Sequence, residues 1–181
     1  MRRLDVLFVH PNASKDIYQK LSDNYSAIEP PIWAMMLAGN VRKYGYSAAI
    51  LDSEAEHLTP KQTAISISEH NPKLVVIVVY GQQPSASTQN MQGVKYICDE
   101  MNKSYPEYKI LLTGLYPSAC SRKSLEDEKA TYICQGEGPQ TILGLLKSNM
   151  NDVSQLKKIP GLWYRDENNN ICYTKPASII P

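Results

Sequence analysis

The chain has 181 residues, which is enough for one domain with a complete core and too few for two full α/β domains. A formal net charge of +1 gives it no electrostatic excess for binding nucleic acid or anionic lipid. The longest apolar run, residues 74–79, is far below the roughly 20 residues that cross a bilayer, and no apolar signal core follows Met1. We therefore expect a cytoplasmic protein with no nucleic-acid or membrane partner.

Strand and helix patterns alternate along residues 1–150. Short apolar runs rich in β-branched residues predict strands at residues 4–9, 47–51, 73–79, 108–112 and 131–134. Helical spacing between them predicts helices at residues 31–45, 60–70, 88–102, 118–125 and 139–147. The third strand is apolar throughout, which is typical of a central parallel strand covered on both faces. Successive β-α units predict an α/β fold of the flavodoxin-like or Rossmann-like kind, with an open parallel five-stranded sheet of order 2-1-3-4-5 and helices on both faces.

The C-terminal segment follows a different pattern. An apolar run at residues 161–165, a polar turn and a second apolar run at residues 171–174 predict a β-hairpin rather than another β-α unit. We therefore divide the chain into a Rossmann-like domain at residues 1–150 and a hairpin with a linker at residues 151–181.

A ligand of such a sheet lies beyond the carboxyl ends of the strands, where the strand order reverses. Residues 10–30, after the first strand, form a far longer connection than an ordinary β-α loop, which is typical of a functional loop or lid, although an excursion without function has the same length. Residues 80–87, after the third strand, are small and polar and could hold a bulky planar ligand. The alternative is that Ser87 or Thr88 only caps the next helix.

Glycines mark the exits of the last two parallel strands. Gly114 follows the fourth strand, and Gly136 and Gly138 precede a proline in the first turn of the last helix. A missing side chain leaves room for a ligand or for tight packing. Together these glycines predict a slot at one edge of the sheet, and a leucine in place of Gly114 is expected to fill the slot and leave the fold intact.

The four cysteines are dispersed, with no pair at C-x-x-C spacing. Neither a disulfide framework nor a zinc site is indicated, and we expect buried or half-buried thiols. The sequence predicts no residue that binds a metal ion.

Two motifs carry a family resemblance. The motif Gly-Glu-Gly-Pro at residues 136–139 is followed by Ile-Pro-Gly-Leu-Trp-Tyr-Arg at residues 159–165. With Pro30 and Pro31 ahead of the first helix, they resemble the N-terminal cobalamin-binding domain of cobalamin-dependent radical-SAM enzymes, and the likeness extends along almost the whole chain. It implies a corrin over the carboxyl ends of the strands and a nucleotide tail buried against the sheet.

The resemblance also implies which residues contact the cobalamin. They lie at the exits of the strands and are Pro11, Asn12, Tyr80, Gly81, Gln82, Gln83, Pro84, Ser85, Gly114, Leu115, Tyr116, Pro117, Gly136, Glu137 and Gly138. A C-terminal radical-SAM domain of the same polypeptide is implied to hold S-adenosylmethionine and a 4Fe-4S cluster. Methyl transfer to a small-molecule or peptide substrate, which the sequence does not specify, is the implied activity.

Two features depart from the patterns of such proteins. The D-x-H-x-x-G motif, which supplies a histidine to cobalt in many cobalamin domains, is absent from the contexts of His10, His57 and His70. This fits the radical-SAM branch, although His10 at the first strand exit is a conceivable ligand and otherwise an ordinary loop residue. The C-x-x-x-C-x-x-C motif is also absent, so we expect no cluster of that type on this chain and no catalysis by the chain alone.

Other proteins of this fold fit less well. A response-regulator receiver needs acidic residues after the first and third strands, where the chain has His10-Pro11 and Tyr80-Gly81. Residues 11–15 provide neither the phosphate loop of a flavodoxin nor the G-x-G-x-x-G turn of a dinucleotide site. The remaining alternative is a degenerate Rossmann-like module that binds no cobalamin and docks a catalytic partner, because fold does not determine function.

Overall fold

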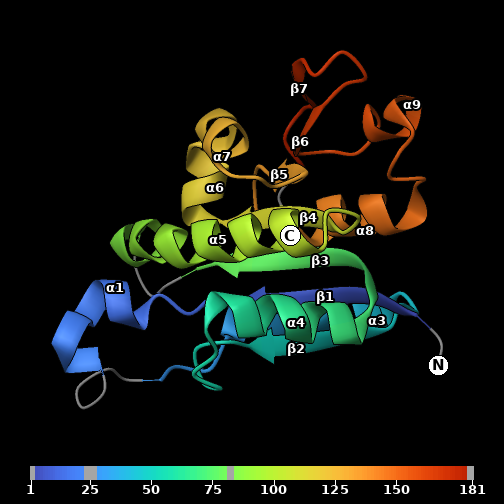
Figure 1. Cartoon of the computed structure of the whole chain (residues 1–181). Coiled ribbons are helices and arrows are strands. Elements are labelled where there is room, and N and C mark those ends of the chain that lie inside the picture. The colour runs from blue at the N-terminus through green and yellow to red at the C-terminus, as the bar shows by residue number, and fades with distance from the viewer. Residues whose placement is uncertain (1–2, 23–27, 81–83, 179–181) are drawn as a thin grey trace.

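A single mixed sheet organises the computed structural model, which describes residues 3–22, 28–80 and 84–178 (Figure 1). Its parallel strands are β1 (Leu4–His10), β2 (Ala48–Asp52), β3 (Pro72–Val79), β4 (Lys109–Gly114) and β5 (Tyr132–Cys134). The antiparallel strands β6 (Leu162–Arg165) and β7 (Ile171–Tyr173) continue the sheet beyond β5. The order is β2-β1-β3-β4-β5-β6-β7, which confirms the predicted fold class and the order of the parallel strands. The sheet has seven strands in the described ranges rather than five, because the hairpin joins it.

Helices cover both faces of the sheet (Figure 1). The cluster of one face contains α3 (Ile32–Lys43) and α8 (Pro139–Lys147), and that of the other contains α4 (Pro60–His70) and α5 (Pro84–Ser104). The shorter helices are α1 (Ser14–Tyr18), η1 (Gln19–Leu21), α6 (Leu115–Ala119), α7 (Ser121–Asp127) and α9 (Val153–Leu156). Among the described residues, no helix combines the length and the apolar character needed to span a membrane.

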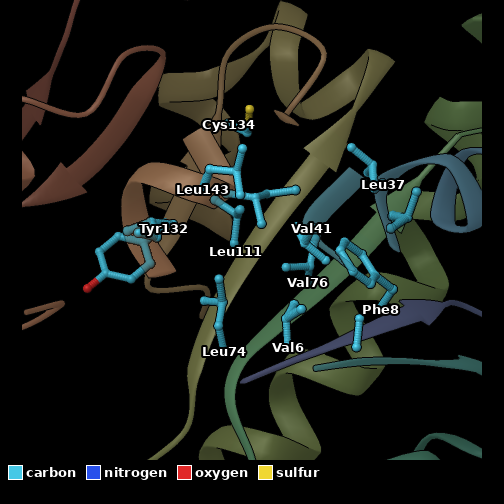
Figure 2. Close-up of a cluster of buried hydrophobic side chains, with 14 of the residues drawn as sticks. Val6, Phe8, Leu37, Val41, Leu74, Val76, Leu111, Tyr132, Cys134 and Leu143 are labelled. Atoms are coloured by element: carbon cyan, nitrogen blue, oxygen red, sulfur yellow. The ribbon is translucent and has the colours of Figure 1, made fainter. Parts of the chain in front are cut away.

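The two faces of the sheet build two separate cores, because successive side chains of a strand point to opposite faces. In β1, Val6 and Phe8 pack on the α3 face, whereas Leu7 and Val9 pack on the α4 face. Figure 2 shows the α3 face, where strand side chains from β1, β3 and β4 meet Leu37 of α3 and its neighbours. Each fully buried side chain of this size contributes about 1.5–3 kcal/mol, so both cores hold the strands that carry the sheet edge.

Local signals explain why α4 begins where the sequence predicts. The Thr59 side chain accepts a hydrogen bond from the Gln62 backbone N–H, and the Gln62 side chain accepts one from the Thr59 N–H, which forms a capping box with Pro60 in the first turn. Asn71 ends the helix in a left-handed conformation. The predicted bounds of α4 and of α8 agree with the structure.

The predicted helices near residues 88–102 and 118–125 differ from the observed ones. Helix α5 already begins at Pro84, so Ser87 lies inside its first turn and is not a cap. Its buried hydroxyl donates to the Val79 carbonyl and accepts the Tyr116 N–H at 3.0 Å, which ties β3 to α6. The second prediction corresponds to α6 and α7, since Cys120 leaves the helical conformation between them.

The glycine of the Ile-Pro-Gly motif allows the hairpin to approach β5. Gly161 has a φ of 68°, and an added Cβ would lie 2.5 Å from the Gln135 carbonyl oxygen. The Gln135 N–H donates to the Gly161 carbonyl at 2.7 Å, and the Thr141 hydroxyl donates to the Pro160 carbonyl at 2.7 Å. This motif therefore has a structural function, because it brings β6 alongside β5.

Candidate functional site

A cavity of about 430 Å³ lies at the carboxyl ends of β1 and β3, where the strand order reverses. Its walls come from the end of β1, the turn after β2, the end of β3, α1 and the first turns of α3 and α5. Residues that line it include His10, Tyr18, Trp33, Glu54, Tyr80 and Asn90. This is the place where open parallel sheets bind ligands, and the volume is within the usual range of roughly 300–1,000 Å³ for small-molecule pockets.

Two stacked aromatic rings form one wall of this cavity. The rings of Trp33 and Tyr80 have centroids 4.4 Å apart and planes inclined by 19°. Tyr80 is 8% exposed and Trp33 is 42% exposed, so the pair joins the core to the cavity surface. Burial, with smaller contributions from Cys134 and Glu137, raises the pKa of Tyr80 to about 12, and the phenol is neutral at pH 7. Asn90 fixes the strand end by donating to the Tyr80 carbonyl at 3.1 Å.

The opposite side of the cavity is polar and acidic. His10 Nδ1 lies 3.2 Å from Asp52 Oδ1, and the His10 side chain is only 13% exposed. Asp52 Oδ1 also accepts the Ala55 N–H at 3.1 Å, which fixes the carboxylate in the turn after β2. Burial raises the pKa of Glu54, which the nearby charge of His10 opposes and that of Asp52 reinforces. In the described ranges, no group of three or more His, Cys, Asp and Glu side chains is arranged to hold a metal ion.

Of the predicted site residues that the structure describes, Tyr80 lines the cavity. Gly81, Gln82 and Gln83 lie outside the described residues. Pro84 and Ser85 are exposed in the first turn of α5.

The long connection after β1 begins with predicted site residues that have structural contacts. Pro11 is buried. Asn12 Oδ1 accepts hydrogen bonds from the Ser14 N–H at 3.1 Å and the Ser14 hydroxyl at 2.7 Å, which starts α1. Gly93 of α5 lets the Asn12 backbone approach closely, because an added Cβ would lie 2.6 Å from the Asn12 oxygen. The connection is thus anchored at its start, and it lines the cavity through Ile17 and Tyr18.

Gly114 has a packing function that the sequence did not reveal. Its φ of 142° and ψ of −178° are essentially restricted to glycine, and an added Cβ would lie 2.6 Å from the Val79 carbonyl carbon. The expectation that a leucine here would leave the fold intact is therefore wrong, because β3 already occupies the space. The next residues form α6, in which Leu115 is exposed, Tyr116 half-buried and Pro117 buried.

The glycines before α8 lie at a small polar cluster behind the sheet edge. Gly136 donates its N–H to Ser118 Oγ at 2.8 Å, and Glu137 is exposed. An added Cβ at Gly138 would lie 3.2 Å from Thr113 Oγ1. This hydroxyl oxygen is buried and has no hydrogen-bond partner among the described residues. The edge near α8 therefore keeps an unused polar group beside a backbone that lacks side chains.

These observations define a doubly wound domain with a ligand cavity at its switch point, and the known proteins it resembles agree. The B12-binding domain family matches residues 19–146, and the chain belongs to this family. The family predicted from the sequence is thereby confirmed.

Particular relatives are much longer than this chain. The anaerobic magnesium-protoporphyrin IX monomethyl ester cyclase of Cereibacter sphaeroides is 22% identical over 165 residues, which are 89% of this chain and 25% of the relative. The cobalamin-dependent S-adenosylmethionine radical enzyme OxsB, solved with aqua-cobalamin and S-adenosylmethionine, has a TM-score of 0.71 at 17% identity over 98% of this chain and 23% of its own. The radical S-adenosylmethionine methyltransferase TsrM from Kitasatospora setae, solved with cobalamin and a [4Fe-4S] cluster, has a TM-score of 0.71 at 20% identity over 100% of this chain and 30% of its own. The likeness to these structures establishes the fold.

Sequence reasoning missed Trp33 and the acidic side of the cavity. The available signal for Trp33 was a large aromatic residue directly after Pro30-Pro31, in the first turn of a helix that follows a long strand exit. Asp52 and Glu54 follow the second strand, and no spacing along the chain relates them to His10.

Proposed function

We propose that this chain is the cobalamin-binding domain of a radical-SAM enzyme and that it holds the corrin at the carboxyl edge of the sheet, next to the cavity between β1 and β3. The observation that carries the proposal is a partly aromatic cavity at the switch point of a chain that belongs to the B12-binding domain family. The relatives solved with cobalamin share this fold over 98% to 100% of the chain.

The residues around the cavity fit part of such a ligand. A corrin with its nucleotide arm is larger than a cavity of about 430 Å³, so the cavity would take one portion and the strand exits would border the rest. The exposed Trp33 ring, backed by Tyr80, offers an apolar surface to a planar group. The unpartnered Thr113 hydroxyl beside Gly138 offers a hydrogen bond to an amide or sugar oxygen of the arm.

The predicted contacts keep their places in this proposal. Tyr80 and the segment that leads to Pro84 and Ser85 would lie beside the corrin. The α6 turn after Gly114 would line the nucleotide tail, and residues 136–138 would border its sugar or base. Residues 1–150 would bind the cofactor, and residues 151–181 would form the hairpin and lead towards the radical-SAM domain.

The wider activity is also a proposal. Bound cobalamin would supply a cobalt-carried methyl group, and this chain would bind, orient and shield it. A radical-SAM domain of the same polypeptide would hold S-adenosylmethionine and the 4Fe-4S cluster, and the reaction would be methyl transfer in the cytoplasm. The relatives support this arrangement, because the chain spans 23% to 30% of the solved ones.

Retention of hydroxocobalamin tests the proposal. The purified chain is incubated with the cofactor and desalted, and the visible spectrum is recorded. We expect retained corrin absorbance, and complete loss of absorbance would contradict the proposal.

The Trp33→Ala variant locates the site. It should retain several-fold less cobalamin with a small change in stability, because an exposed aromatic pair contributes only about 0.5–1.5 kcal/mol beyond its burial. The matched control is Trp163→Ala, since Trp163 stacks on Tyr173 at 4.8 Å and 20° in the hairpin. Equal retention by the two variants would place the corrin elsewhere.

A docking module that binds no cobalamin is the second candidate. It is favoured by the tight packing of Gly114 against β3 and of Gly138 against Leu37 and Thr113, which fills the predicted slot with protein atoms. Loss of all corrin absorbance from a folded chain would support this candidate.

A further inference from the structure

The position of His10 places an imidazole at the ligand cavity. It is the last residue of β1, and strand alternation puts its side chain on the α3 face with those of Val6 and Phe8. It lines the cavity together with Tyr80, which is on the same face of β3. The imidazole is therefore held by the strand core and not by an adaptable loop.

Asp52 determines which ring nitrogen of His10 carries the proton. An ionised carboxylate only accepts hydrogen bonds, so His10 Nδ1 donates to Asp52 Oδ1 across 3.2 Å. A neutral imidazole then has its lone pair on Nε2, for which the described residues provide no hydrogen-bond partner. Metal-binding histidines in proteins show the same arrangement, in which a carboxylate on one nitrogen orients the ring and raises the basicity of the other.

The other side chains of the cavity are poorer ligands for cobalt. Glu29 and Glu54 are hard oxygen donors, and the Tyr80 phenol keeps its proton because its pKa is about 12. Imidazole nitrogen suits first-row transition metals better than carboxylate oxygen does. His10 Nε2 is the nitrogen donor that the described cavity lining offers from a histidine.

We propose that His10 Nε2 is an axial ligand of the cobalt in the bound cobalamin and that Asp52 positions it. This inference rests on the proposed function and assigns a ligand outside any D-x-H-x-x-G motif. The competing explanation is an ion pair that only joins the ends of β1 and β2.

Electron paramagnetic resonance of the reduced complex separates these explanations. The full chain is labelled with [¹⁵N]histidine, loaded with hydroxocobalamin, desalted and reduced to cob(II)alamin. One axial nitrogen splits each cobalt line into a doublet if it is ¹⁵N and into a triplet if it is ¹⁴N. We expect doublets, because only a histidine of the protein carries the label.

Variants assign the doublet to one residue. His10→Gln retains an N–H donor for Asp52 and should lose the doublet, whereas His70→Gln, at the end of α4, should keep it. Asp52→Asn should weaken the imidazole ligation about 10- to 100-fold and reduce the share of the doublet, as the loss of a supporting carboxylate does in other metal sites. Neither the His70 variant nor the unlabelled chain should change the amount of cobalamin retained.

The outcomes distinguish this inference from the proposed function. Triplets in the labelled chain would identify the benzimidazole of the cofactor as the ligand, and lines without nitrogen splitting would show that no nitrogen binds the cobalt. Either result with retained corrin would overturn the assignment of His10 alone. Absence of corrin after desalting would overturn the proposed function as well.

Discussion

Gly114→Ala should destabilise the fold by about 4 kcal/mol, and the cost has two sources. Holding a residue with a side chain at a φ of 142° and a ψ of −178° costs about 1–3 kcal/mol. The new Cβ would also lie 2.6 Å from the Val79 carbonyl carbon, so β3 or β4 must shift, and overpacking of this kind costs about 1–3 kcal/mol. A typical domain has only about 5–15 kcal/mol of stability, so the loss is large.

Urea unfolding followed by far-UV circular dichroism measures this cost. With a slope of about 2 kcal/mol per molar urea, the midpoint should fall by about 2 M. Gly136→Ala is the matched control, since Gly136 has a φ of 113° but nothing within 4 Å of an added Cβ. It should lose only the conformational cost of about 1–2 kcal/mol. Equal midpoint shifts for the two variants would refute the close approach of Gly114 to β3.

Two further substitutions test the sheet edge and its base. Ser87→Ala should lower the free energy of unfolding by about 1–3 kcal/mol in urea titrations, because it leaves the buried Tyr116 N–H without an acceptor, whereas Ser85→Ala, at an exposed position, should have almost no effect. Burial alone would raise the pKa of Asp5, but hydrogen bonds from Lys73 and Ser47 lower it to about 2, below its ordinary 3.8. The carboxylate therefore stabilises the fold above pH 3.8 and loses this effect as the pH falls towards 2, so unfolding curves of Asp5→Asn should lack that part of the acid dependence.

Periodic segments were predicted well because their signals are local. The Thr59 cap and Pro60 mark the start of α4 within a few residues of sequence, and the apolar run of β3 reports burial on both faces. The hairpin was also recognised, but its pairing with β5 was not. That pairing depends on Gly161 meeting Gln135, which are far apart in the sequence.

The candidate site was predicted less well because it forms by convergence. Tyr80 was identified from its place after the most apolar strand, and the structure stacks it on Trp33, which comes from another element. The carboxylate beside His10 comes from β2, and no motif connects the two. Glycine at a strand exit has two explanations in a sequence, and the coordinates assign Gly114 to packing.

The hairpin that continues the sheet beyond β5 has a consequence for self-association. Without it, β5 would present unpaired backbone groups that could template a strand from another molecule. The outermost strands are instead β2, with five residues, and β7, with three. Arg42 also donates to the Ala48 carbonyl of β2 at 2.5 Å, which occupies one acceptor of that strand. Concentrated solutions of the folded chain should therefore resist edge-to-edge β assembly.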